Sequence, residues 1–211
     1  MTDSDVHVLG VCTVPDQTAP AQARHETAPE NEDVVGEIVD RLRTAGATTT
    51  SKLVYTHNRR EEIDRIAKAE ASDVILVPHH AERMEWILVQ LRGDVNVEQI
   101  TGVVGGFPND TLGHVQLLHA ADSELDQPIG EALLAMAREQ LRESGIDEQV
   151  IDAELVESDD AVGTIIERAK NYDAIVMGGN KPSLMDYIFG DVPHRISQAS
   201  GCPVFVVPPK S

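Results

Sequence analysis

Along this chain, apolar runs that predict strands are followed by segments whose apolar residues recur at helical spacing. Val6–Val14 is an extended apolar run, which predicts a strand. The stretch after it is rich in Pro, Gln and Ala and is expected to form a loop as far as Glu30. From Asn31 onward, Val and Ile recur at helical spacing until Gly46, a residue type that commonly follows a helix end. The chain is therefore expected to begin with a strand, a loop and an amphipathic helix.

The remainder of the first half continues this alternation. Residues 51–57 predict a second strand, an amphipathic helix follows, and Asp73–His80 predicts a buried strand. Residues 84–91 predict a short helical run, and Ile100–Pro108 predicts one more short strand that ends at the proline. The expected order is strand, helix, strand, helix, strand, with a short helix and a closing strand after it.

The second half repeats this order. Apolar runs predict strands, and the segments between them have helical periodicity, the first of them ended by Gly145. The predicted elements are a strand at 114–122, a helix at 130–144, a strand at 149–158, a helix at 161–170 and a strand at 173–180.

Short sequence matches between the halves occur in the same order in both. They pair residues 72–77 with 172–177, 84–87 with 185–188, and Gly93-Asp94-Val95 with Gly190-Asp191-Val192. Repeated order of this kind indicates a tandem duplication. We expect two related domains, residues 1–108 and 109–211, with the boundary near Pro108. Alternating strands and helices predict an α/β fold in which each half is a doubly wound parallel-sheet unit.

The negative charge of the chain argues against some classes of binding partner. It has 36 Asp and Glu against 17 Lys and Arg, a formal net charge of −19. Such a charge repels nucleic-acid phosphates and anionic lipid headgroups, so direct binding of nucleic acid or insertion into a membrane is not expected. The acidic residues are spread through the chain, as in cytoplasmic proteins of extreme halophiles, and we expect the protein to be unstable in low salt.

No segment has the features of a signal peptide or the length of a membrane span, so a cytoplasmic location is expected. The two cysteines, Cys12 and Cys202, lie in apolar runs without a metal-ligand or redox spacing, and we expect them to be buried thiols.

The end of the chain carries the most specific pattern. A strand that ends in glycines at 173–180 is followed by Phe189–Pro209, in which a helix starts at a Gly-x-Val and Cys-Pro-Val leads into a last apolar strand. This pattern resembles the universal stress protein family. The resemblance implies an adenine nucleotide alpha hydrolase-like, Rossmann-like fold. It also implies similarity to cytoplasmic regulatory domains associated with membrane transporters.

Members of that family that bind ATP receive the phosphates on a glycine-rich loop after the fourth strand. Gly178 and Gly190 match two glycines of the loop, but Lys181 stands at the place of another and Asp191 at the place of a Ser or Thr. A carboxylate there would repel a triphosphate, and Asp191 is also a good helix N-cap, so a tight turn and helix start is the favoured interpretation. The candidate cofactor-binding residues are Gly178, Gly179, Asn180, Lys181, Ser183, Gly190, Asp191 and Val192.

Each half lacks a recognisable counterpart of the family's first strand and helix, where an aspartate normally meets adenine. Residues 100–106 either close the first half as its last strand, which we favour, or replace the first strand of the second half. Half-units without a central strand would be poorly closed, so we expect the halves to pack together and the protein to form a homodimer through exposed edges.

Other clusters of candidate residues are weaker. His57, His79, His80 and Glu82 lie near predicted strand ends and could bind a metal or sense protons, but their spacing favours solvent-facing loops, and no metal is expected. Around Trp86, core packing is expected unless partial exposure marks a partner surface.

No nucleophile elbow or activated cysteine is present, and no carboxylate stands out as an acid or base, so the protein is not expected to be an enzyme. The leading hypothesis is a non-catalytic stress-response or regulatory module that acts through protein partners, with a membrane transporter as the expected partner and no cofactor. The alternative is a switch that binds ATP or another nucleotide at the Gly178/Gly190 loop. A small hydrolase is a third, weaker hypothesis.

Overall fold

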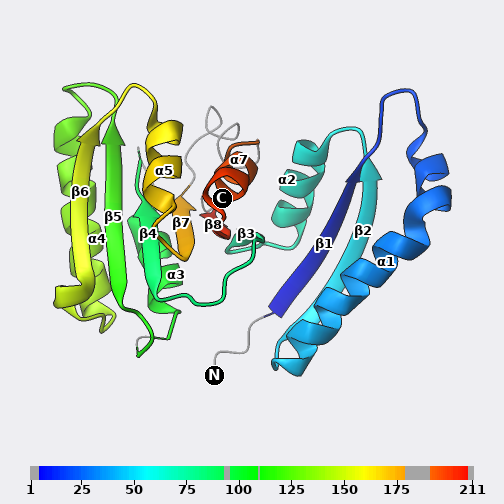
Figure 1. Ribbon diagram of the computed structural model, residues 1–211, viewed down its shortest axis with the longest axis horizontal. Coiled ribbons are helices and arrows are strands. Elements are labelled where there is room, and N and C mark those ends of the chain that lie inside the picture. The colour runs from blue at the N-terminus through cyan, green and yellow to red at the C-terminus, as the bar shows by residue number, and fades with distance from the viewer. Residues whose placement is uncertain (1–4, 93–95, 109, 179–190, 209–211) are drawn as a thin grey trace. The chain divides into compact units, whose positions relative to one another are not determined.

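The computed structural model describes residues 5–92, 96–108, 110–178 and 191–208, and the chain divides into two compact units (Figure 1). The N-terminal unit is Met1–Ala69 and the C-terminal unit is Glu70–Ser211. Each unit contains parallel strands connected by helices, so the α/β class expected from the sequence is confirmed.

The N-terminal unit has two strands and two helices. Strand β1 (Asp5–Thr13) leads through helix α1 (Pro20–Thr44) to strand β2 (Thr48–Thr56), and helix α2 (Arg59–Ala69) follows. The two strands pair in parallel over their full nine residues. Gly46, which follows α1, has a φ of 94°, so the predicted glycine at the helix end is confirmed.

Helix α1 begins earlier than the sequence analysis predicted. Residues 20–30 are helical, so the expected loop as far as Glu30 is wrong. Pro20 stands in the first turn, where its missing N–H costs no hydrogen bond, and alanine, the strongest helix former, recurs after it. Pro29 lies inside the helix, which loses one backbone hydrogen bond there without ending.

The C-terminal unit is built on a six-stranded sheet. Its strands lie in the order β3-β8-β7-β4-β5-β6, and all neighbours are parallel except β3 and β8. The elements are β3 (Ile75–Val77), β4 (Trp86–Gln90), α3 (Val97–Gly105), β5 (His114–Ala121), α4 (Gln127–Glu143), a 3-10 turn (Glu148–Val150), β6 (Ile151–Glu157), α5 (Ala161–Ala169), β7 (Ala174–Gly178), α7 (Asp191–Ser200) and β8 (Val204–Val207).

Two of the predicted elements in this region are wrong. Residues 84–91 were expected to be helical, but they contain β4, a central strand in which Ile87, Leu88 and Val89 are all buried. A strand covered on both faces has no alternation of apolar and polar residues, so its short apolar run resembles a buried helix.

Residues 100–108 were expected to contain a closing strand, but most of them belong to α3. Asn96 caps this helix by accepting a hydrogen bond from the backbone N–H of Gln99, and the hydroxyl of Thr101 donates to the carbonyl of Val97 one turn earlier. These two polar side chains stabilise the helix despite the β-branched residues in it.

The two halves of the chain do not repeat one topology. The third strand predicted for the first half, β3, pairs with β8 in the sheet of the C-terminal unit. β4 and α3 precede β5, so the C-terminal unit does have a strand and a helix at the place where the sequence analysis expected none. The units consequently divide after Ala69 and not near Pro108.

Helices cover both faces of the six-stranded sheet, with α3 and α4 on one side and α5 and α7 on the other (Figure 1). The core between the sheet and the first pair joins strand residues such as Val89 and Leu117 to Ile100 of α3 and Leu141 of α4. Side chains alternate along each strand, so Leu88 and Gln90 lie on the opposite face, toward α5 and α7. In the part of the chain that the structure describes, no helix is long and apolar enough to cross a membrane.

Candidate functional site

The strand order of the C-terminal sheet defines one place where a ligand is expected. The strands β5 and β6 extend to one side of the central strand β4, and β7 and β8 extend to the other. The chain therefore reverses its winding direction between β4 and β7. In open α/β sheets, ligands bind in the crevice outside the carboxyl ends of the strands at such a switch point. Gln90, the last residue of β4, pairs there with Met177 of β7.

Gln90 is the unusual residue at this edge. It is 1% exposed, and neither the nitrogen nor the oxygen of its side-chain amide has a hydrogen-bond partner among the residues that the structure describes. The hydroxyl of Ser197 on α7 is also buried without a partner in the same set. A buried polar group without a hydrogen bond costs about 1–3 kcal/mol, so each of these groups is a position that a bound molecule could stabilise.

The predicted nucleotide loop is only partly described. Gly178 is the last residue of β7 and pairs with Val207 of β8. Asp191 and Val192 are the first two residues of α7. The other predicted loop residues, Gly179, Asn180, Lys181, Ser183 and Gly190, lie outside the described residues. The described members are placed at the carboxyl end of β7 and at the start of a helix, where a backbone N–H can receive an anion.

A buried histidine lies near the same edge, on the other side of β4. The imidazole of His119 is fully buried, with Nδ1 3.0 Å from the carbonyl of Leu91 and Nε2 3.1 Å from the carboxylate of Asp126. Both ring nitrogens therefore contact an oxygen atom, one of the backbone and one of a side chain. The histidine thus connects the end of β4 to the start of α4.

Two further contacts support this connection. Arg92, two residues after the end of β4, pairs with Asp122 after β5 at 2.8 Å. Gly130 of α4 lies directly against the His119 ring, and a Cβ at this position would be 2.3 Å from the ring carbon Cδ2. The signal for this cluster in the sequence is His119, a polar residue inside the apolar run 114–121, which was not among the predicted site residues.

The histidines considered for a metal do not assemble into a site. His79 and His80 are exposed in the loop after β3, and His80 Nε2 lies 3.9 Å from Glu82, which is also exposed. His57 of the N-terminal unit binds the carbonyl of Val14 through Nδ1 at 3.0 Å. Within the described ranges, no three His, Cys, Asp or Glu side chains are grouped so that they could hold a metal ion.

Of the two cysteines, Cys202 is the buried thiol that was predicted. Its sulfur donates to the carbonyls of Tyr172 at 3.0 Å and Ala169 at 3.3 Å. Burial raises the pKa of the Cys202 thiol, which keeps it protonated and unreactive near neutral pH. Cys12 is only partly buried, and it also has no disulfide.

Aromatic rings gather at the amino end of β4. Trp86 lies 5.2 Å from the ring of His114, which stacks on Tyr172 at 5.9 Å. Trp86 is 49% exposed, so this group is not closed core. Burial, together with the nearby Glu154 carboxylate, raises the pKa of the Tyr172 hydroxyl. Tyr187 and Phe189, which correspond to this group in the second half of the sequence, lie outside the described residues.

Comparison with known proteins identifies the fold of this architecture. The chain aligns with a solved universal stress protein from Archaeoglobus fulgidus DSM 4304 over 97% of its own length and 85% of the other chain, at 15% identity and a TM-score of 0.63. A protein of Pseudomonas aeruginosa UCBPP-PA14, assigned to the universal stress proteins, aligns over 96% of this chain and 93% of its own, at 14% identity and a TM-score of 0.50.

A third structure, the Archaeoglobus fulgidus universal stress protein in complex with dAMP, covers 57% of this chain and 95% of its own length. Its identity of 17% and TM-score of 0.46 are too low to indicate what the present chain binds. No curated protein sequence matches the chain significantly. The sequence match is confined to one part of the chain: residues 108–208 match the universal stress protein family.

Proposed function

We propose that this protein is a non-catalytic, stress-related regulatory protein whose C-terminal unit binds an adenine nucleotide at the carboxyl ends of β4 and β7. The observation that carries the proposal is the side-chain amide of Gln90, which is buried at the switch point of the sheet and has no hydrogen-bond partner among the described residues. The family match over residues 108–208 supports the ligand class, because the resemblance implies adenine nucleotides.

An amide is suited to recognise a base. It offers a donor and an acceptor side by side, the pattern that adenine presents on its own edges. A ligand that forms hydrogen bonds with both groups would offset the free-energy cost of burying the amide. Binding would then stabilise the C-terminal unit by mass action and connect the nucleotide level to the shape of the surrounding loops.

The test is a calorimetric titration with ATP, ADP and AMP in multimolar KCl, where the acidic chain is expected to be folded. We expect saturable binding of at least one nucleotide by the unchanged protein. Gln90→Met should lower the affinity by about ten-fold or more, since two hydrogen bonds are lost. Gln90→Met should also raise the melting temperature without ligand, because a buried unpaired amide is removed.

The matched control is Gln116→Met, the same substitution near the amino end of β5. Its amide nitrogen donates to the carbonyl of Leu117, and it lies far along the strand from the switch point. Nucleotide affinity should be unchanged in this variant. If none of the three nucleotides binds the unchanged protein, or if Gln90→Met binds as tightly, the nucleotide part of the proposal is wrong.

The output of the regulator is proposed to be a protein partner, with a membrane transporter as the candidate implied by the resemblance. Catalysis is not part of the proposal, and the protein incubated with ATP should release no phosphate above the rate of a blank. A groove in the N-terminal unit favours the partner-binding part of this function.

A further inference from the structure

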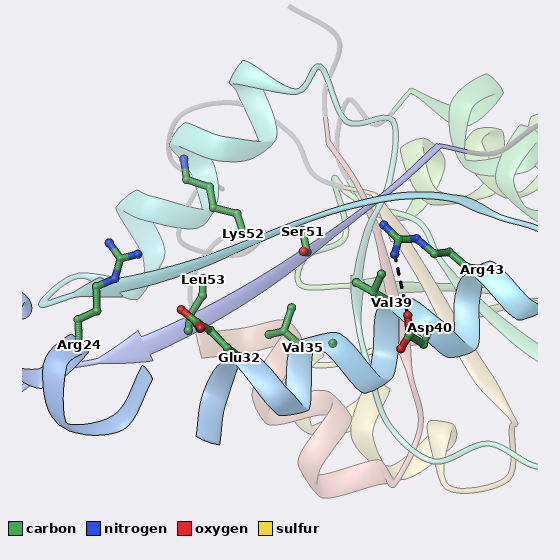
Figure 2. Close-up of a pocket in the computed structure, with 10 residues that line it drawn as sticks. Arg24, Glu32, Val35, Val39, Asp40, Arg43, Ser51, Lys52 and Leu53 are labelled. Carbon is green, nitrogen blue, oxygen red and sulfur yellow. Dashed lines mark ion pairs between the residues drawn. The ribbon is translucent and has the colours of Figure 1, made fainter. Parts of the chain in front are cut away.

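The N-terminal unit has an open groove beside its second strand. The groove has a volume of about 590 Å³ and runs between α1 and β2 (Figure 2). Val35 and Val39 of α1 and Leu53 of β2 contribute apolar surface to it. All of the lining residues belong to the N-terminal unit, so the groove is a feature of this unit alone.

The wall of the groove on the β2 side carries free backbone groups. Among the described strands, β2 pairs only with β1, so its other edge is open. The carbonyl of Thr56 accepts a hydrogen bond from Val14, the residue that follows β1, so it points toward that strand. Backbone groups alternate in direction along a strand, and those of Ser51 and Leu53 therefore point away from β1 and into the open edge.

The groove is open because one residue of α1 has no side chain. Gly36 lines the groove, and a Cβ built on it would meet no atom within 4 Å. Glycine inside a helix costs about 1 kcal/mol relative to alanine, so this residue leaves space at the expense of helix stability. Any larger side chain at residue 36 would extend into the space beside β2.

The lining of the groove is richer in cations, relative to carboxylates, than the chain as a whole. Eight of the 17 Lys and Arg residues lie in the first 69 residues. Three of them, Arg24, Arg43 and Lys52, line the groove together with the carboxylates of Glu32 and Asp40, and Asp40 forms an ion pair with Arg43 (Figure 2). Among the described residues, neither Arg24 nor Lys52 has a carboxylate at ion-pair distance, although the charge of Lys52 also acts on the Glu62 carboxylate of α2.

One end of the open edge is already closed by the protein itself. The guanidinium of Arg43 donates to the carbonyl of Thr49 at 3.4 Å. An exposed edge strand can pair with other chains, and proteins usually protect it. Among the residues that the structure describes, this contact involves only Thr49, and the stretch from Ser51 to Leu53, beside Gly36, stays open.

We propose that this groove binds an extended peptide segment with acidic side chains, which adds to β2 as a third strand between β2 and α1. The backbone of the peptide would pair with Ser51 and Leu53, its apolar side chains would contact Val35 and Leu53, and its carboxylates would meet Arg24 and Lys52. The inference rests on the part of the proposed function that concerns protein partners.

The test uses the full chain without nucleotide, so that its outcome is independent of the ligand site in the C-terminal unit. The probe is a fluorescein-labelled octapeptide of alternating Glu and Val, titrated by fluorescence anisotropy. We expect saturable binding, with about ten-fold or more loss of affinity when Lys replaces every Glu. Hydrogen exchange of the Ser51 and Leu53 amides should slow when the peptide is bound.

Variants of the protein separate the groove from general charge attraction. Gly36→Leu fills the groove and should lower the peptide affinity by about ten-fold or more, whereas Gly36→Ala should change it by about two-fold at most. Arg24→Glu should weaken binding by a similar factor. Arg41→Glu is an equal change of charge on an exposed residue of α1 that does not line the groove, and it should weaken peptide binding less than Arg24→Glu does.

Two results would overturn the proposal. One is the absence of saturable binding of the Glu peptide by the unchanged protein. The other is equal binding of a peptide that is N-methylated at every second residue, because methylation removes the N–H groups that strand pairing requires. If the peptide does not bind but a nucleotide does, the groove proposal is wrong and the nucleotide proposal is unaffected. If the peptide binds but no nucleotide does, the nucleotide proposal is wrong and the groove proposal is unaffected.

Discussion

The contact between Gly130 and His119 allows a strong prediction about stability. Replacing a helical glycine by alanine normally stabilises a protein, since alanine favours the helix by about 1 kcal/mol. At Gly130 the added Cβ would lie 2.3 Å from Cδ2 and 2.8 Å from Nε2 of His119, closer than any stable contact. The ring is fully buried and hydrogen-bonded at both nitrogens, so it cannot move without losing these bonds.

The size of the effect follows from these contacts. Displacing the ring would leave the Leu91 carbonyl and the Asp126 carboxylate with poor partners, at about 1–3 kcal/mol for each bond. After subtracting the gain in helix propensity, we expect Gly130→Ala to lower the free energy of unfolding of the C-terminal unit by about 2–4 kcal/mol. The melting temperature should fall by roughly 5–15 °C.

The assay is urea unfolding in high salt, followed by tryptophan fluorescence. Trp86 is the one tryptophan of the chain, and it lies in the C-terminal unit, so the signal reports on that unit. Gly102→Ala is the matched control, because a Cβ on this exposed glycine of α3 meets nothing within 4 Å. That variant should be as stable as the unchanged protein, or more stable by up to about 1 kcal/mol.

A double-mutant cycle isolates the contact. In the background of His119→Ala, which removes the ring, Gly130→Ala should cost nothing or should stabilise the unit. The coupling free energy between the two positions should then be about 3 kcal/mol or more. If Gly130→Ala stabilises the unchanged protein as Gly102→Ala does, or if its cost is the same with and without the ring, the assigned packing of His119 is wrong.

Three further predictions concern the C-terminal unit and the whole chain. The carboxylate of Asp173 accepts hydrogen bonds from the backbone N–H groups of Glu85 and Trp86, each at 2.9 Å, so Asp173→Ala should destabilise the unit by about 2 kcal/mol and Asp173→Asn by less, in urea unfolding. Burial raises the pKa of Cys202 and Tyr172 in the folded protein, so both protonated groups favour folding below their ordinary pKa values and this effect is lost as the pH rises. The melting temperature should therefore fall above about pH 9, and it should fall less steeply in Cys202→Ala. The net charge of −19 predicts that the melting temperature rises from dilute buffer to multimolar KCl, and equal values in both would contradict the expected self-repulsion.

Much of the fold could be read from the sequence because most elements have clear periodicity. The strands around Val6–Val14 and in the second half, and the helix ended by Gly145, were placed within a few residues of their observed positions, whereas only the end of the helix before Gly46 was. These segments have an apolar stripe or an uninterrupted β-branched run with a turn residue at the end. In such segments local preference and tertiary packing agree.

The errors cluster where this agreement fails. The central strand β4 is buried on both faces, so its pattern carries no period, and the β-branched helix α3 depends on its cap at Asn96. With β4 mistaken for a helix, the role of Gln90 at the end of the central strand could not be recognised. Gly178 was placed correctly at the end of a strand, because the glycines that follow an apolar run mark this position in the sequence itself.

The position of β4 also has a practical consequence for shortening this protein. The stretch with family similarity, residues 108–208, starts after β4 and α3, although β4 lies between β5 and β7 in the middle of the sheet. A fragment cut at the limits of that similarity would lose its middle strand, together with the short segment that shields the outer side of β8. The smallest piece that can be expected to fold independently therefore starts near Glu70, well ahead of where similarity to relatives begins.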